Sequence, residues 1–71
     1  MKLTKIERIE CYGKGVERWY FPKDLTLGRW ENFLQNKISG NEDFLYFVDN
    51  DGTMITLNPS LFASVEVYKH D

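Results

Sequence analysis

Residues 44–57 read FLYFVDNDGTMITL, two short apolar runs on either side of a turn rich in Asp, Asn and Gly. Runs of this length with β-branched and aromatic residues predict strands, and Asn and Gly tolerate the positive φ angles of a tight hairpin. The sequence therefore predicts two antiparallel strands, Phe44–Val48 and Thr53–Leu57, joined through residues 49–52.

The faces of this hairpin depend on how its turn closes. Closure at Val48/Thr53 or at Asn50/Thr53 gives the same grouping, because opposed residue numbers sum to an odd value in both cases. One predicted face then carries Leu45, Phe47, Met54 and Thr56. The other predicted face carries Phe44, Tyr46, Val48, Ile55 and Leu57. Both faces are largely apolar.

Turn signals divide the rest of the chain into four further elements. Gly13 and Gly15, Pro22 and the corner at residues 58–60 mark their limits. The predicted elements are the strands Lys2–Cys11, Val16–Phe21 and Ala63–Tyr68 and the helix Asp24–Ile38. The order ββαβββ predicts an α+β fold, a small antiparallel sheet or half-open barrel of about five strands with one covering helix.

The helix is predicted from a single apolar stripe. Its members share one face of a 3.6-residue period and are Leu27, Trp30, Phe33, Leu34 and Ile38. Asp24 or Thr26 can cap the first turn, and Gly40 suits the left-handed residue that follows a helix. Gly28 costs about 1 kcal/mol relative to alanine inside a helix, so a start after Gly28 is the alternative.

Length and composition limit the function classes. A chain of 71 residues with one cysteine predicts one domain without an internal disulfide or a multi-cysteine zinc site. No apolar run approaches a membrane span, and the charged first ten residues do not predict a secretory signal. We therefore expect a cytoplasmic protein. No nucleophile has a base at suitable spacing, so the sequence predicts neither an enzyme nor a cofactor.

The two apolar faces of the hairpin exceed what one helix can cover. Barrel curvature would bury both faces, whereas an exposed face would mark a protein-binding or self-association surface. We predict an interface formed by Leu45, Phe47, Met54 and Thr56, with an unidentified protein or a second copy as the partner. Residues 1–37 carry eight basic and five acidic side chains, and residues 38–71 carry one basic and six acidic. The acidic side chains of the second half either keep the protein soluble and protect its strand edges or steer it toward a basic partner.

Single-stranded nucleic acid is the alternative partner. Small barrels stack bases on aromatic side chains and contact the phosphates with Lys and Arg. The candidate platform is formed by Lys14, Arg18, Trp19, Tyr20 and Lys23. A net charge of −2 opposes this alternative, because phosphate contacts require a positive potential.

The sequences GTMITLNP at residues 52–59 and LFASVE at residues 61–66 describe a strand, a corner and a strand. This pattern resembles one common in very small β-rich proteins of Gram-positive bacteria and their phages. The likeness covers about a fifth of the chain. It implies a short accessory protein, encoded by a phage or prophage, that works by binding. No functional residue is carried over from it.

Overall fold

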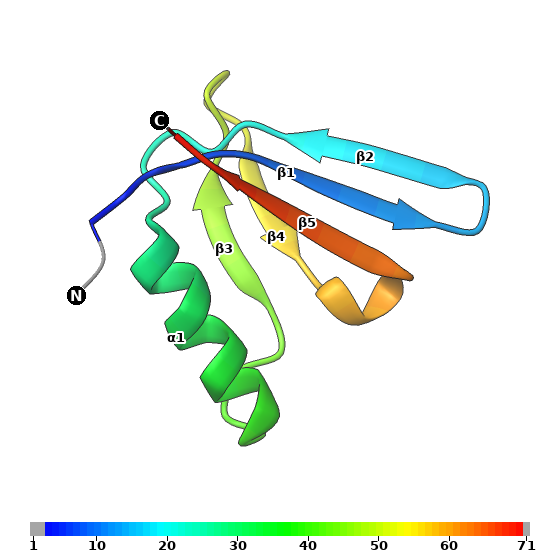
Figure 1. The fold of residues 1–71 in the computed structure, drawn as a ribbon. Coiled ribbons are helices and arrows are strands. Elements are labelled where there is room, and N and C mark those ends of the chain that lie inside the picture. Colours follow the sequence, from blue (N-terminus) through cyan, green and yellow to red (C-terminus); the bar gives the residue numbers. More distant parts are fainter. Residues whose placement is uncertain (1–2, 71) are drawn as a thin grey trace.

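The computed structural model describes residues 3–70 and contains one α-helix, one 3-10 helix and five strands (Figure 1). The elements in chain order are β1 (Ile6–Gly13), β2 (Val16–Tyr20), α1 (Leu27–Ile38), β3 (Leu45–Val48), β4 (Met54–Leu57), η1 (Pro59–Leu61) and β5 (Ser64–Lys69). All strand pairs are antiparallel. The predicted α+β fold with the order ββαβββ is confirmed.

The first strand differs from its prediction at both ends. β1 continues to Gly13 rather than ending at Cys11, because Gly13 pairs with Val16 across a two-residue turn. Gly15 in that turn has a φ of +74°, which glycine adopts without a steric penalty. At its other end β1 begins at Ile6, and the predicted start at Lys2 lies outside the described residues.

The strands form two sheets that enclose the core. One sheet has the order β2-β1-β5 and the other pairs β3 with β4. The segment after β2 joins them, because Pro22 forms a bridge with Asp49 and the Lys23 N–H donates to the Val48 carbonyl oxygen at 2.8 Å. The result is two antiparallel sheets linked at this point, with α1 beside β3 (Figure 1).

The caps of α1 explain how it accommodates a glycine. The helix begins one residue before Gly28, later than the predicted start at Asp24. Thr26 caps it, and the Thr26 hydroxyl oxygen accepts a hydrogen bond from the Arg29 N–H at 3.1 Å. This cap offsets part of the cost of the glycine. At the other end Gly40 has a φ of +82° and terminates the helix as predicted.

The core lies between the two sheets and α1. Its largest fully buried side chains are Phe33, Ile9, Leu45 and Cys11. From α1, Trp30 and Phe33 are buried, whereas Leu34 and Ile38 at the end of the predicted stripe are exposed. The helix therefore covers the inner faces of the sheets with Trp30 and Phe33.

The β3–β4 hairpin pairs in a register that differs from the prediction. Val48 lies opposite Met54, so opposed residue numbers sum to an even value. The inward face carries Leu45, Phe47, Ile55 and Leu57, and the outward face carries Tyr46, Val48, Met54 and Thr56. The predicted grouping of these side chains was wrong.

The turn of the hairpin gives the physical reason. The Asp49 N–H donates to the Thr53 carbonyl oxygen at 2.8 Å, which leaves a loop of three residues between them. The last of these, Gly52, has a φ of +90°. A three-residue loop that ends in a left-handed residue is a common hairpin connection. The predicted closures had loops of two or four residues, and either one would reverse the faces of β4.

Candidate protein interface

The four residues predicted to form an interface are divided between the two faces of the hairpin. Leu45 and Phe47 are buried and pack in the core. Met54 is 81% exposed, and Thr56 is exposed on the same outward face. The prediction of one shared face is wrong, but exposed apolar strand surface remains on the outward side of β3 and β4.

That outward side carries four exposed apolar side chains, which we call the outer patch: Phe21, Tyr46, Val48 and Met54. Tyr46 is 63% exposed and Met54 is 81% exposed. Val48 and Met54 are direct cross-strand partners, so their side chains lie side by side. The Phe21 backbone lies beside the end of β3, where its carbonyl oxygen accepts from the Asn50 N–H at 2.8 Å.

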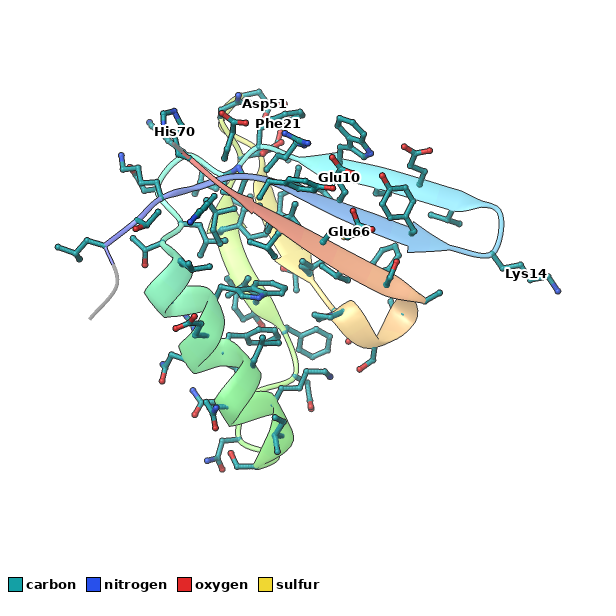
Figure 2. All side chains as sticks on the ribbon, viewed as in Figure 1. Glu10, Lys14, Phe21, Asp51, Glu66 and His70 are labelled. Carbon is teal, nitrogen blue, oxygen red and sulfur yellow. The ribbon has the colours of Figure 1, made fainter. Side chains whose placement is uncertain are left out.

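Charged side chains of both signs lie around the outer patch. Lys23 is exposed in the segment that pairs with β3, and Asp43 and Asp51 are exposed near the two ends of the hairpin. The Asp51 carboxylate accepts from the Thr53 N–H at 2.9 Å, and this bond lowers the pKa of Asp51. Asp51 is therefore charged at neutral pH. Figure 2 shows Phe21 and Asp51 at the same end of the molecule.

The outer face of the β2-β1-β5 sheet carries a network of polar and aromatic side chains that was not predicted from the sequence. Glu10 is only 4% exposed, and its carboxylate accepts from Arg8 Nε and from the Tyr12 hydroxyl, both at 2.5 Å. The Arg8 guanidinium carbon lies 3.9 Å from the Tyr68 ring centroid and 5.5 Å from that of Trp19. Each polar group of this network is therefore paired within the sheet itself.

Spacing along the strands could have indicated this network. Side chains two positions apart on a strand point to the same face. The Trp19 Nε1–H donates to the Glu17 carboxylate at 2.9 Å, and the Tyr68 hydroxyl donates to Glu66 at 2.7 Å. Figure 2 shows Glu10 and Glu66 on this sheet. A repeat of Glu with Tyr or Trp two residues away is thus a usable signal for such a face.

Glu10 is expected to make the stability of the protein depend on acid pH. Hydrogen bonds from Tyr12 and then Arg8 lower the pKa of Glu10 from its usual 4.5. The bond to Glu10 also raises the pKa of Tyr12 to about 12. Because the folded-state pKa of Glu10 lies below the unfolded value, the stabilisation is complete above that value and is lost as pH falls through the folded-state pKa. The thermal midpoint should therefore decline below pH 4.5.

Glu10→Gln tests this expectation because it removes the charge and keeps the side-chain size. Its thermal midpoint should be lower at neutral pH and should decline less steeply in acid when unfolding is followed by circular dichroism. Part of the decline should persist, since Arg29 lowers the pKa of Glu42. Asp43→Asn removes an exposed carboxylate outside the network and serves as the control. A Glu10→Gln profile as steep as that of the wild type would contradict the expectation.

Trp19 belongs to the candidate nucleic-acid platform and lies on the outer face of the β2-β1-β5 sheet. Its ring is partly exposed, but Arg8 lies against it and its Nε1–H is bonded to Glu17. The acidic neighbours Glu10 and Glu17 share that face, which disfavours contact with phosphates.

The other platform residues lie on different surfaces. Tyr20 faces inward and its ring makes an edge contact with Phe47, with the centroids 5.9 Å apart. Arg18 lies on the same inward row of β2. Lys14 stands at the tip of the β1–β2 turn, at the far end of the molecule from the segment that carries Lys23 (Figure 2). The structure does not bring these residues together with Trp19.

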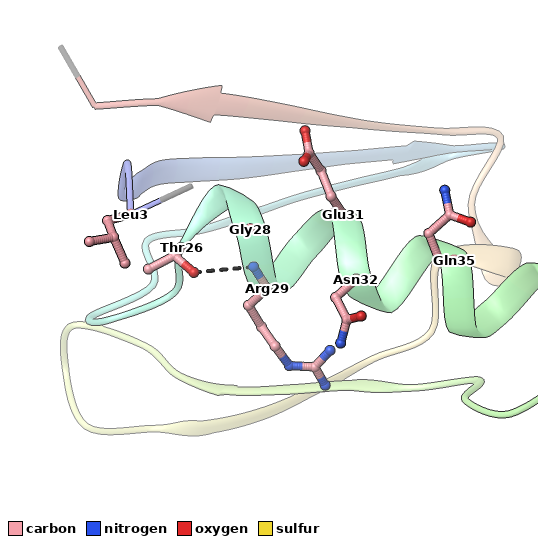
Figure 3. Close-up of a pocket in the computed structure, with 7 residues that line it drawn as sticks. All are labelled: Leu3, Thr26, Gly28, Arg29, Glu31, Asn32 and Gln35. Atoms are coloured by element: carbon pink, nitrogen blue, oxygen red, sulfur yellow. Dashed lines mark hydrogen bonds between the residues drawn. The ribbon is translucent and has the colours of Figure 1, made fainter. Parts of the chain in front are cut away.

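A surface hollow on α1 offers no convergent chemistry (Figure 3). Glu31 and Gln35 extend to one side of the helix, and Arg29 and Asn32 extend to the other. The Arg29 guanidinium is also paired with Glu42 at 2.6 Å. The polar groups of this hollow therefore do not meet at a common point where a ligand could react.

Cys11 is the one cysteine of the chain and lies in the core. Cys11 is fully buried, and burial raises the pKa of its thiol, which disfavours the reactive thiolate. Within residues 3–70 no group of three His, Cys, Asp or Glu side chains is placed to hold a metal ion. The same residues include no helix with the length and apolar character needed to cross a membrane.

Comparison of the chain with protein-family models, with curated proteins and with solved structures gives no match. The function is therefore inferred from the surfaces described above. Among these, the outer patch brings the exposed side chains of Tyr46, Val48 and Met54 together on one face of a hairpin.

Proposed function

We propose that the protein is a small binding module whose outer patch pairs with a second copy of the chain. The proposal rests on the exposure of Tyr46, Val48 and Met54 on one face of a hairpin whose opposite face is core. Exposed apolar patches on soluble proteins usually mark interfaces, and aromatic and methionine side chains are enriched there.

The charges around the outer patch favour a second copy as the partner. In a two-fold interface, any contact between two different residues occurs twice, once in each direction. Lys23 of one copy would therefore pair with Asp51 of the other, and the reciprocal pair would form as well. A standard interface buries about 800 Å² per partner. The described chain has a surface of 4973 Å², so pairing would use about a sixth of it.

Single-stranded nucleic acid has less support as a partner. Its candidate residues are dispersed, and the net charge of −2 opposes phosphate binding. The resemblance of residues 52–66 to small phage and Gram-positive accessory proteins agrees with a binding role in the cytoplasm. Both the phage origin and the cytoplasmic location stay predictions.

Self-association is testable with the protein alone. The mass measured by light scattering should rise with concentration from 8.4 kDa toward twice that value. Met54→Asp introduces a charge into the outer patch and, by symmetry, does so twice in each dimer. We expect the dissociation constant to increase by about tenfold or more, as for a central interface residue.

Leu61→Asp is the matched control for this test. Leu61 is 76% exposed, comparable with Met54, but it lies on η1 outside the outer patch. The dimer should be unaffected by this change. A wild-type mass that stays at one chain at every concentration would overturn the proposal, and so would an equal loss of dimer in both variants.

A further inference from the structure

An apolar groove of about 500 Å³ lies beside β2, and none of the four side chains of the outer patch lines it. One wall is the inward row of β2, formed by Val16, Arg18 and Tyr20. The facing wall comes from the ends of the β3–β4 hairpin and from η1, with Phe44, Leu57, Leu61 and Phe62. This volume falls within the range of small-molecule sites, roughly 300–1,000 Å³.

The apolar side chains of the groove are incompletely covered. Val16 on β2, Phe44 just before β3 and Leu61 on η1 are all exposed. Tyr20 packs against the core from one wall, and Phe62 packs against it from the other. An apolar ligand in the groove would remove this surface from water, which is favourable in proportion to the area covered.

Arg18 interrupts the apolar pattern of β2. Its cross-strand partner is the buried Cys11, so Arg18 belongs to the inward face of the sheet. Its neighbours on that face are Val16 and Tyr20, two residues away on either side. A charged residue at an inward position breaks the binary pattern of a strand, and such exceptions concentrate at functional sites.

Arg18 also differs from the other two arginines in its partners. Arg8 is paired with Glu10, and Arg29 is paired with Glu42. Arg18 has no ion pair within residues 3–70, and no acidic side chain is among the groove residues described there. A free guanidinium offers a planar set of donors that matches a carboxylate.

We propose that the groove binds a linear fatty acid of medium chain length. Its carboxylate would pair with the Arg18 guanidinium, and its alkyl chain would lie between Val16 and Leu61. The ligand is an anion because Arg18, the charged side chain beside the apolar surface of the groove, is a cation. It is small because the groove has the volume of a small-molecule site rather than the area of a protein interface.

Sodium decanoate is the probe for this proposal, titrated into the 15N-labelled full chain and followed by NMR. The amide signals of Val16, Arg18 and Leu61 should shift in a saturable way, whereas those of Tyr46 and Met54 should not. Octanoate should bind on the order of tenfold more weakly than decanoate, because it buries two methylene groups fewer. Decan-1-ol, which lacks the charge, should bind about tenfold more weakly or worse.

Four variants distinguish binding in the groove from a general attraction between charges. Arg18→Gln should weaken decanoate binding by about tenfold or more, whereas Lys14→Gln removes a charge from the same hairpin and should change it by less than about twofold. Leu61→Asp should also weaken binding, and Met54→Asp should not. Unchanged binding to Arg18→Gln, an equal loss in Lys14→Gln, equal affinity for decan-1-ol, shifts confined to the outer patch or no saturable binding would each overturn the proposal.

Discussion

Phe47→Ala is expected to lower the free energy of unfolding by about 3–5 kcal/mol, the usual cost of deleting a buried phenyl ring. Phe47 is buried in the core, and its ring makes an edge contact with Tyr20. This contact joins the inner faces of the two sheets. A chain of this length has a total stability of about 4–10 kcal/mol, so the variant should keep only a small margin of stability.

Met54→Ala is the matched control, since Met54 belongs to the same hairpin but faces outward. Measured at a concentration at which the chain is monomeric, its free energy of unfolding should change by less than about 0.5 kcal/mol, as for other surface positions. Urea unfolding followed by circular dichroism measures both variants. If Met54→Ala proved the more destabilising change, the two faces of the hairpin would be reversed from those described.

Phe33→Ala is expected to lower the free energy of unfolding by a similar amount, about 3–5 kcal/mol. Phe33 is fully buried and lies against Trp30, with ring centroids 5.8 Å apart. Removing its ring leaves a cavity where α1 meets the sheets, and the transfer of apolar surface to the core is lost as well. The helical circular dichroism signal should therefore disappear at a lower urea concentration.

Leu34→Ala tests whether this effect is specific to the buried face of α1. Leu34 is the next residue along the helix and is exposed. Its truncation should cost less than about 1 kcal/mol. Equal destabilisation by the two variants would mean that the helix packs on the sheets differently from the arrangement seen here.

The elements of this fold follow from local signals in the sequence. The apolar stripe of α1, Gly40 after its last turn and the corner at Pro59 are each decided by a few neighbouring residues. Their physical causes are helical periodicity, a left-handed backbone conformation and the missing N–H of proline. Such causes act without tertiary context, so the order of the elements could be predicted.

The register of the β3–β4 hairpin could not be predicted in the same way. An Asp-Asn-Asp-Gly turn is compatible with loops of two, three or four residues. Hydrophobic alternation normally selects one of them, but β3 and β4 are apolar on both faces, so each register pairs apolar side chains. The packing of Leu45 and Leu57 in the core distinguishes them, and that packing involves β1 and α1.

The candidate sites depend even more on distant parts of the chain. Arg8 meets Tyr68 because β1 pairs with β5, from opposite ends of the sequence. The groove near Arg18 requires β2 to lie over η1, which follows almost forty residues later. The sequence could therefore identify Met54 and Trp19 as candidate binding residues, but it could not identify their neighbours.

The network around Glu10 has a consequence for how the three-stranded sheet holds together. Its hydrogen bonds connect Arg8 with Glu10, Tyr12 with Glu10, Trp19 with Glu17 and Tyr68 with Glu66, and each joins two residues of one strand. Across the strands, the Arg8 guanidinium lies close to the rings of Trp19 on β2 and Tyr68 on β5. One side chain of the central strand thus ties all three strands together on this face.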